Sequence, residues 1–428
     1  MIRSIVVILL LLNSVNFIAQ RTSSSPYSYF GIGDQFSPRT VEQNAMGGIG
    51  VAFSHYKYLN FTNPAAYADL RATSYTIGLL NSDLTVKSGS AEQNSTSTSL
   101  SYIALAFPVG KNAGVSFGMQ PVSAVGYSLS NTILVNGSVS EVTAYSGNGG
   151  VNRFYGSFGI KVYKGFTLGV EADFSFGDIE NSIINQRANV SLATKYNEVL
   201  NLRGTSVKFG AQYQKELENS LTVTAGATVK LGNSLNVEGN DYLYSFRFAN
   251  SGAESPKDTL SSTLIDGEFN LPLKSNFGVG LGKLDKWYAG VEYETQNAIG
   301  SNNLLTNTTG AYRYGKSDRI SLGGFYLPKV NSISSYWERV TYRAGVRYEN
   351  TGLLVDGTGN NSNFTKINDF GISFGLGLPL KRLSTVNMGF EFGKRGTTEN
   401  NLIQENYFNF RLSLSLTDTN WFIKRKID

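Results

Sequence analysis

Apolar and polar residues alternate strictly along much of the chain, and the pattern is clearest near the C-terminus. Between residues 407 and 416, every second residue from Phe408 to Leu416 is apolar, and the residues between them are Asn409, Arg411, Ser413 and Ser415. Successive side chains of a β-strand point to opposite faces. This pattern therefore predicts a strand with one apolar face and one polar face.

The same period of two recurs in thirteen earlier segments. Each predicted strand has roughly 9 to 16 residues, which is enough for a tilted strand to cross a bilayer and protrude a little. The fourteen predicted strands are 73–81, 98–108, 113–128, 148–162, 166–178, 206–216, 221–231, 272–283, 287–295, 318–327, 339–349, 366–378, 385–394 and 407–416.

Short and long connections alternate strictly between these strands. Seven connections are long, among them 83–97, 179–205, 232–271 and 296–317. Outer-membrane barrels combine short periplasmic turns with longer external loops and have an even number of strands. Lipid offers no hydrogen-bond partner to an unpaired sheet edge, so such a sheet must close. The sequence therefore predicts an all-β fold, a 14-stranded antiparallel transmembrane β-barrel with both termini in the periplasm of a bacterial outer membrane.

The composition supports a barrel and argues against other classes. Only 16% of residues are charged and 41% are apolar, and no run after the N-terminal stretch is long enough for a spanning helix. The chain has no Cys, which excludes disulfides, thiolate metal sites and a cysteine nucleophile. The net charge of +5 shows no basic block outside the last residues, so nucleic acid is not an expected partner.

The two ends of the chain do not alternate. Residues 1–19 have the charged start and short apolar core of a secretory signal peptide, with Ala19 before the expected cleavage point. Residues 20–72 are rich in Gly and Pro turns, and a barrel of fourteen strands is wide enough to need internal content. We therefore expect a hatch at 20–72, the barrel at 73–416 and a periplasmic tail at 417–428, in which Trp421 and Phe422 are candidate interfacial anchors. Aromatic residues near the predicted strand ends indicate interfacial girdles; they are Tyr163, Phe166, Trp287, Tyr288, Tyr326, Trp337 and Tyr348.

Within the predicted hatch, Gly47 and Gly48 lie in a stretch of small residues, and Asn63, Pro64 and Ala65 follow it shortly before the first strand. This combination resembles the N-terminal hatch of the FadL-like outer-membrane transporters of long-chain fatty acids and other hydrophobic compounds. The opening at residues 26–34 is similar to relatives from Bacteroidota-type bacteria. The resemblance implies passive uptake, in which external loops capture a hydrophobic ligand and the hatch gates its passage.

Charged residues on the polar strand faces are predicted to point into the lumen. They number seven cations and six anions, a near balance that favours mutual ion pairs and bonds to the hatch residues Asp34, Arg39, Glu42, Asp69 and Arg71 over a selective ion pore. Arg343 and Arg347 are candidates for binding a carboxylate, together with a third residue from another strand, and Arg411 is a further lumen candidate. Glu292 and Glu294 share one strand face at a spacing compatible with acid–base chemistry, although a lumen lined by many charges produces such pairs by chance. The full predicted set is Arg153, Lys161, Lys208, Lys230, Arg343, Arg347, Arg411, Glu171, Asp173, Glu292, Glu294, Glu349 and Glu391.

The sequence gives little support for enzymatic chemistry or for a cofactor. His55 is the only histidine, and no residue that could orient it as a base is identifiable. The glycine runs 278–282 and 371–377 lie on predicted strands, where they leave room for a plug or a ligand rather than cradle phosphate. The loop 356–361 has oxygen donors but no downstream Glu to complete a calcium site. We expect no enzyme activity, no cofactor and no bound metal.

Two functions are compatible with these patterns. The leading prediction is hatch-gated diffusion of hydrophobic or amphipathic small molecules, with membrane lipids and such a ligand as partners. The alternative is a non-transporting barrel that serves as a subunit of a larger outer-membrane assembly, such as a secretion or barrel-insertion machine. The long connection 232–271 and the basic tail fit the alternative well.

Overall fold

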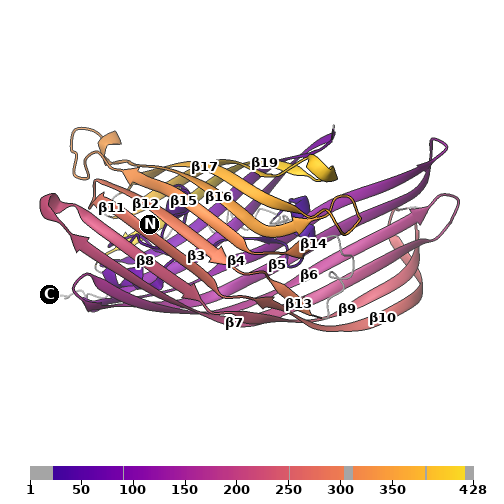
Figure 1. Cartoon of the computed structure of the whole chain (residues 1–428), viewed down its shortest axis with the longest axis horizontal. Coiled ribbons are helices and arrows are strands. Elements are labelled where there is room, and N and C mark those ends of the chain that lie inside the picture. Colours follow the sequence, from indigo (N-terminus) through magenta and orange to yellow (C-terminus); the bar gives the residue numbers. More distant parts are fainter. Residues whose placement is uncertain (1–22, 90, 250, 303–311, 381–382, 420–428) are drawn as a thin grey trace, which may run out of the picture.

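The computed structural model describes residues 23–89, 91–249, 251–302, 312–380 and 383–419. Fourteen antiparallel strands form a barrel that closes where β19 pairs with β2 (Figure 1). This confirms the predicted fold class and strand number. The barrel strands are β2 (Thr73–Ser88), β3 (Ala91–Val109), β4 (Ala113–Val135), β5 (Ser138–Tyr163), β6 (Phe166–Arg187), β7 (Ala193–Glu216), β8 (Thr222–Lys230), β11 (Lys274–Lys283), β12 (Trp287–Gln296), β15 (Ser317–Tyr326), β16 (Thr341–Val355), β17 (Thr365–Pro379), β18 (Thr385–Gly396) and β19 (Gln404–Asp418).

The remaining described elements are short or lie outside the main wall. Among the described residues, no helix is long and apolar enough to cross a membrane. These elements are η1 (Pro26–Tyr29), β1 (Asp34–Gln35), α2 (Val41–Asn44), η2 (Pro64–Asp69), η3 (Glu218–Ser220), β9 (Asn233–Phe248), β10 (Glu254–Leu271), β13 (Gly300–Asn302), β14 (Tyr312–Tyr314), η5 (Trp337–Arg339) and η6 (Glu399–Asn401).

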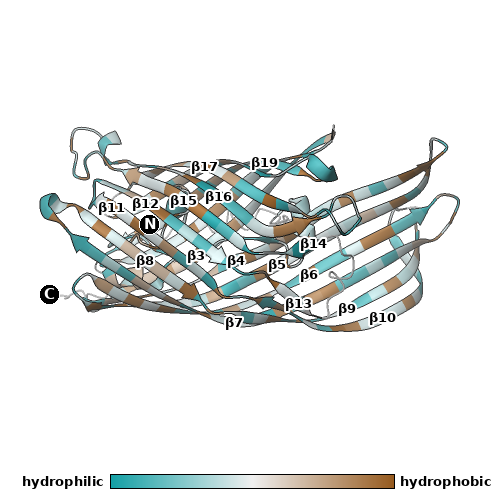
Figure 2. Ribbon diagram, in the orientation of Figure 1, coloured by the Kyte–Doolittle hydropathy of each residue, from teal (hydrophilic) through white to brown (hydrophobic). Residues whose placement is uncertain are grey.

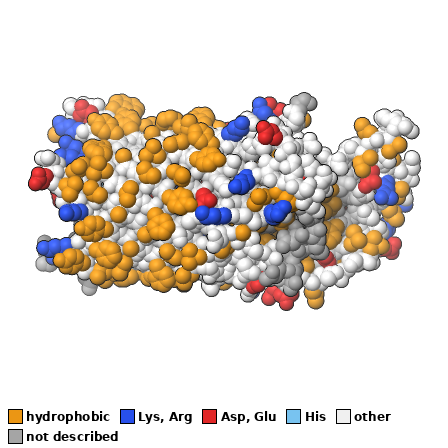
Figure 3. Space-filling view, viewed as in Figure 1, with side chains coloured by type: hydrophobic (Ala, Val, Ile, Leu, Met, Phe, Trp, Pro, Cys, Tyr) orange, Lys and Arg blue, Asp and Glu red, His pale blue; other side chains and the backbone are white. Residues whose placement is uncertain are grey.

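A belt of apolar side chains surrounds one half of the barrel. It lies toward the end that carries the turns 110–112, 164–165 and 284–286, which we call the short-turn end (Figure 3). Phe158, Phe209, Val279 and Phe374 are exposed on this surface, as expected for side chains that face lipid. Hydrophobic and hydrophilic residues alternate along the ribbons of the wall (Figure 2).

Four wall strands continue well beyond the belt, toward what we call the extended end. β4, β5, β6 and β7 have 23, 26, 22 and 24 residues, longer than the sequence predicts. The predicted loops 83–97 and 179–205 are largely strand, and 232–271 folds into the hairpin β9–β10, which joins the wall because β9 pairs with the outer part of β7. The prediction of long irregular loops was therefore wrong for these three connections.

These connections form strands because the apolar and polar faces of the sheet exchange places beyond the membrane. On β7, Phe209 is 51% exposed outside the barrel and Lys208 is buried within it, whereas Leu200 and Leu202 of the outer part are buried on the inner face. Beyond the membrane the outer face meets water, so apolar residues turn inward as in a soluble protein. They form a cluster inside the extended end that includes Ile32, Val125, Val151, Ile179, Leu200, Leu202, Leu235, Val237 and Phe269.

The N-terminal region packs inside the barrel, and we use the name hatch for its described residues, 23–72. It starts against the outer part of β4, where Ser28 Oγ accepts a hydrogen bond from Gly126 N. It reaches β2 at Thr73, which pairs with Asp418 at the short-turn end. The chain thus enters and leaves the barrel wall at the same end. Trp421 and Phe422, the predicted anchors, lie outside the described residues, as does the predicted signal peptide.

Aromatic side chains gather near the short-turn end, as the predicted interfacial girdle requires. Tyr163, Tyr326 and Trp337 are 73%, 57% and 62% exposed. Tyr288, which the sequence places with them, is instead buried, and its ring packs against Phe53 of the hatch. Alternation explains the difference, because Tyr288 follows the half-exposed Trp287 and must point to the other face.

Candidate functional site: the hatch in a charged lumen

The Asn-Pro-Ala motif shapes the last turn of the hatch before the wall. Asn63 caps η2, since its Oδ1 accepts a hydrogen bond from Ala65 N at 3.0 Å, and Pro64 occupies the first helical position. The side-chain amide of Asn63 donates to Val51 O at 2.8 Å and to Ala211 O of β7 at 3.0 Å. Asn63 is fully buried, so this one side chain joins two hatch segments to the wall.

Gly47 and Gly48 form a second contact point. Both have left-handed backbone, with φ of +69° and +89°. Gly47 N donates to Ser373 Oγ of β17 at 2.9 Å, and Gly47 O accepts from Arg319 of β15 at 3.1 Å. A Cβ on Gly47 would lie 2.8 Å from Val346 O, so only glycine fits between the hatch and the wall here.

Inward-facing glycines of the wall receive the hatch backbone at many strands. A Cβ on Gly345 would lie 2.2 Å from Gly47 N, and one on Gly226 would lie 2.0 Å from Val51 O. In the predicted glycine runs, Gly278 faces Val51 and Gly375 faces Ala45, so the prediction that such glycines make room for a plug is confirmed at these two positions. The set in contact with hatch backbone is Gly114, Gly126, Gly159, Gly169, Gly226, Gly323 and Gly345, and Gly210 contacts the side chain of Asn63 and the ring of Pro64.

Glu292 of β12 binds the hatch through both carboxylate oxygens. Oε2 accepts hydrogen bonds from Gly50 N at 2.6 Å and from Val51 N at 2.7 Å. Oε1 accepts from Arg39 at 3.0 Å and from Asn276 of β11 at 2.7 Å. The residue is 2% exposed. A carboxylate with four donors is well satisfied in a buried position, and here three of those donors belong to the hatch.

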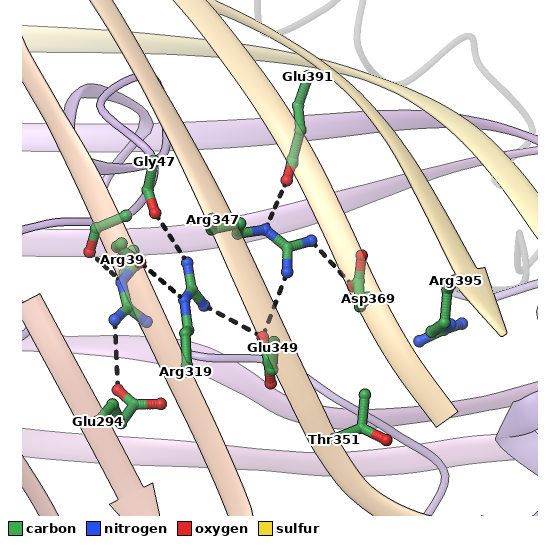
Figure 4. Close-up of polar contacts among 12 residues, drawn as sticks. Arg39, Gly47, Glu294, Arg319, Arg347, Glu349, Thr351, Asp369, Glu391 and Arg395 are labelled. Carbon is green, nitrogen blue, oxygen red and sulfur yellow. Dashed lines mark hydrogen bonds and ion pairs between the residues drawn. The ribbon is translucent and has the colours of Figure 1, made fainter. Parts of the chain in front are cut away.

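A network of arginines and carboxylates fills the centre of the lumen (Figure 4). Arg39 also contacts Glu294 at 3.2 Å, and Arg319 contacts Glu349 at 3.6 Å. Arg347 is the centre of the network, with Glu349, Asp369 and Glu391 at 3.2, 3.0 and 2.8 Å. Toward the extended end, Arg395 joins the wall to the hatch through Asp34 at 2.6 Å and to Glu405 at 2.6 Å.

A second cluster lies on the opposite wall. Arg153 of β5 contacts Glu171 and Asp173 of β6 at 3.0 and 3.3 Å. Lys208 contacts Glu171 at 2.9 Å and donates to Phe61 O of the hatch at 2.8 Å, and Lys230 contacts Asp173 at 3.3 Å. Buried charges are tolerated only when they are paired in this way.

Several cavities adjoin the described hatch residues, and two of them offer room for a ligand. The larger, of ≈ 240 Å³, is lined largely by the charged network, including Arg319, Arg347 and Arg395. The smaller, of ≈ 130 Å³, lies between the hatch and β7, β8 and β11, and its lining combines Phe36 and Leu231 with Lys208, Lys230 and other cations. The larger space thus offers balanced charge to a ligand, and the smaller one is half apolar.

The structure separates some of the candidates that the sequence groups. Arg347 lies in the central network, whereas Arg343 donates to Asn387 at 3.3 Å and lies over the Tyr58 ring near the short-turn end. Arg411 contacts Glu391 at 2.5 Å, which links it to Arg347 but not to Arg343. Glu292 and Glu294 share Arg39, so both act here as partners of the hatch rather than as an acid and base pair.

Arg319 and Arg395 lie in the lumen but are absent from the lumen charges predicted from the sequence. Arg319 lies within a predicted strand, next to the lipid-facing Ile320, so alternation alone would have placed it in the lumen. Arg395 falls one residue beyond the predicted end of its strand, but it has the same parity as Glu391. Of the hatch residues predicted to bind lumen charges, Asp34, Arg39 and Asp69 form ion pairs with the wall, and Glu42 accepts from Asn387. Arg71 instead donates to carbonyls of the hatch itself.

His55 and the loop after β16 serve local structure. Burial lowers the pKa of His55, which lies at the short-turn end with its ring 3.3 Å from Asp285 of the β11–β12 turn. Lys57 and Arg343 lower the pKa further, and Asp285 partly offsets this. The Asp356 carboxylate accepts hydrogen bonds from Thr358 and Ser362 of its own loop. Among the described residues, no group of three or more His, Asp and Glu lies close enough to hold a metal ion.

Comparison with known proteins places the chain in a family. The family model described as BamG matches residues 1–428. The chain belongs to the BamG family. A search of curated proteins finds no match.

Solved structures show the same fold as this BamG-family barrel. The toluene transporter TodX of Pseudomonas putida is similar at a TM-score of 0.58 and 15% identity, over 90% of this chain and 99% of that chain. A FadL homologue of Pseudomonas aeruginosa gives a TM-score of 0.59 and 12% identity, over 90% of this chain and 99% of that chain. The predicted FadL-like outer-membrane barrel is thereby confirmed at the level of the fold.

Proposed function

We propose that the protein is a non-transporting subunit of the machinery that assembles β-barrels in the outer membrane. The family model supports this proposal, because membership of the BamG family suggests a subunit of the barrel-assembly machinery. The proposal selects the alternative among the two functions that the sequence allows. It assigns no catalytic role to His55 and names the other subunits of the machinery as the partners.

The observation that carries the proposal is the way the hatch is held. Glu292, Arg319 and Arg395 each bind it through polar contacts from a different strand, and those of Glu292 and Arg319 are buried. A hydrogen bond to a charged group contributes about 1.5–3 kcal/mol. Because several such bonds must break together before the hatch can move, a fixed plug is favoured over a gate that opens during each transport event.

The orientation and the anchoring of the chain belong to the same proposal. The short-turn end faces the periplasm, as in barrels with short periplasmic turns and long external extensions, and the barrel wall begins at Thr73 and ends at Asp418 on that side. The proposal also gives Trp421 and Phe422, which lie outside the described residues, the role of anchors at the inner interface, with the basic residues that follow directed to anionic headgroups.

Gentle purification from native membranes tests the proposal. A tagged copy of the chain is extracted in a mild detergent, and proteins and lipids are identified by mass spectrometry. We expect the other subunits of the assembly machinery in fixed stoichiometry, and we expect depletion of the chain to lower the amount of folded outer-membrane barrels. Recovery of the chain alone, with unchanged barrel levels after depletion, would contradict the proposal.

Hatch-gated uptake of hydrophobic or amphipathic molecules is the second candidate. The half-apolar cavity of ≈ 130 Å³ favours it, because Ile32, Phe36 and Leu271 adjoin Lys230 there, a combination suited to a small amphipathic ligand. Uptake of a radiolabelled fatty acid and of labelled toluene by cells with and without the chain separates the two functions. A loss of uptake with intact barrel assembly supports transport, and the reverse supports the subunit.

A further inference from the structure

The barrel wall is split above the membrane between β3 and β4. The two strands pair only from Ile103 with Met119 to Val109 with Ala113. Beyond Met119, β4 stays paired with β5 as far as Val135, and β3 stays paired with β2 as far as Ala91. In Figure 1 the tips of the β2–β3 and β4–β5 hairpins lie far apart. Among the described residues, no wall strand covers the outer part of this edge of β4.

Part of the same edge already holds a strand. Asp34 and Gln35 of β1 pair with Ala124 and Ser123, and Phe36 N donates to Val122 O at 2.8 Å. Gly126 N then donates to Ser28 Oγ of the hatch at 3.1 Å. The edge of β4 therefore accepts an extended segment, and the hatch occupies only its first residues.

Main-chain groups of alternate residues point to the same edge of a strand. Because Gly126 directs its N–H to the open edge, residues of the same parity, Ser128, Ser130 and Thr132, do so as well. The side chains of these three residues are exposed. An exposed row of such groups is a template for pairing with another chain.

The tip of this hairpin lacks the charges that normally protect an open edge. No charged residue occurs from Asn112 to Ser140. Ile133, Leu134 and Val135 are 47%, 60% and 54% exposed. By contrast, the β2–β3 tip carries the ion pair of Lys87 with Glu92, at 3.0 Å. Natural sheets discourage edge pairing with charges, so their absence here points to an edge that has a partner.

Lipid does not explain the apolar tip. Phe154 of β5 marks the outer part of the lipid-facing belt and pairs with Met119, whereas Ser128 pairs with Ser146, eight residues farther along β5. At roughly 3.3 Å per residue this is about 26 Å along the strand. The open edge therefore lies outside the bilayer, where burial of its aliphatic side chains requires a protein.

We propose that the open edge of β4, Ser128 to Val135, binds an extended, uncharged segment of another subunit by strand addition. Main-chain hydrogen bonds supply the pairing, and aliphatic side chains of that segment cover Ile133, Leu134 and Val135. The inference rests on the proposed function, because it names the surface on the external side through which the chain joins the assembly.

A photo-crosslinking residue at Leu134, in the full-length protein in native membranes, tests this surface. The variant Thr132→Pro removes an N–H on the open edge without removing a bond to β5, whereas Thr132→Val keeps that N–H and the shape of the side chain. A photo-crosslinker at Val190, which is 49% exposed in the β6–β7 connection, is the matched control position. Migration of the unboiled protein on gels verifies that each variant forms the barrel.

We expect the Leu134 position to trap one other subunit, through a peptide that mass spectrometry shows to be uncharged over at least five residues. Thr132→Pro should lower the yield at least tenfold, and Thr132→Val should not. A product with lipid or with a second copy of the chain, a product insensitive to Thr132→Pro, or no product would overturn the inference. If stoichiometric partners co-purify without a product at Leu134, the edge proposal fails while the proposed function stands; if the chain purifies alone, both fail.

Discussion

The carboxylate of Glu292 provides the sharpest test of how the hatch is held. Glu292→Ala removes the acceptor of Gly50 N and Val51 N, which are 2.6 and 2.7 Å from Oε2. It also leaves Arg39, which is buried, with Glu294 as its remaining carboxylate. The substitution thus leaves two buried backbone N–H groups and the side-chain amide of Asn276 without this acceptor, and it removes one buried ion pair.

The expected loss follows from these contacts. Removal of one partner of a buried ion pair costs about 3–5 kcal/mol, because the other charge stays buried. Since about 1.4 kcal/mol corresponds to a tenfold change in an equilibrium, release of the hatch should become roughly 10² to 10³ times more favourable. The barrel itself should stay folded, since Glu292 lies within an intact strand ladder.

Hydrogen exchange of the purified protein measures this release. Amides from Gly47 to Phe53 should exchange roughly 10² to 10³ times faster in Glu292→Ala, while amides of β12 keep their protection. Asp369→Ala is the matched control, because the Asp369 carboxylate is buried and its hydrogen-bond partners, Arg347 and Tyr407, belong to the wall. Unchanged protection of the hatch in Glu292→Ala would show that apolar packing, rather than this carboxylate, fixes the plug.

Four further predictions test other contacts. Asn63→Asp should destabilise the hatch nearly as much as Asn63→Ala, by about 2 kcal/mol, because both variants lose the side-chain donor. Hydrogen exchange of the amides near Val51 measures this loss, and wild-type protection in Asn63→Asp would contradict the prediction. Gly345→Ala should prevent the hatch from seating, since its Cβ would lie 2.2 Å from Gly47 N; trypsin sensitivity of the hatch reports this, and a resistant hatch would refute it. Burial lowers the pKa of His55, so below about pH 6.5 the unfolded chain binds more protons than the folded one, and stability should fall as pH decreases through that value. The loss should be at most about 1.4 kcal/mol per pH unit. Thermal unfolding of His55→Gln should no longer show this slope, and an equal slope would exclude His55 as its source. In whole cells, an impermeant maleimide should label Ser138→Cys and not Lys111→Cys, which are exposed at opposite ends of a chain without native cysteines; the opposite result would invert the proposed orientation.

The membrane-spanning part of the fold was predictable because lipid imposes one rule on every strand. Segments such as 385–394 and 407–416 show apolar residues at every second position, and the structure pairs them as β18 and β19. The outer parts of β6 and β7 follow the same period with the faces exchanged, since Leu200 and Leu202 point inward where Lys208 does farther down. A search for strands whose apolar residues all face lipid overlooks these outer parts, where the apolar residues face inward.

The site was predictable in its composition but not in its pairing. Parity identifies which charges enter the lumen, and for Glu391 and Arg411 it also places them on neighbouring strands. It does not show that Arg347 reaches three carboxylates or that Glu292 binds hatch amides, because these contacts depend on how the hatch crosses the lumen. The glycines that face the hatch can be predicted from the sequence only when two facts are combined: they occupy inward-facing strand positions, and the lumen contains a plug.

The distribution of contacts indicates where this barrel can act. In the lumen, a displaced hatch would take three of its four donors from Glu292 and would take Asp34 from Arg395, leaving Asn276 and Glu405 as their wall partners. At the extended end, apolar packing around Val151 and Leu202 closes the interior without ion pairs, while the edge of β4 keeps main-chain groups uncovered. Movement through the barrel therefore has to break many charged contacts at once, whereas strand addition at the rim breaks none. A protein built in this way is better suited to hold a partner at its outer wall than to pass a ligand through its centre.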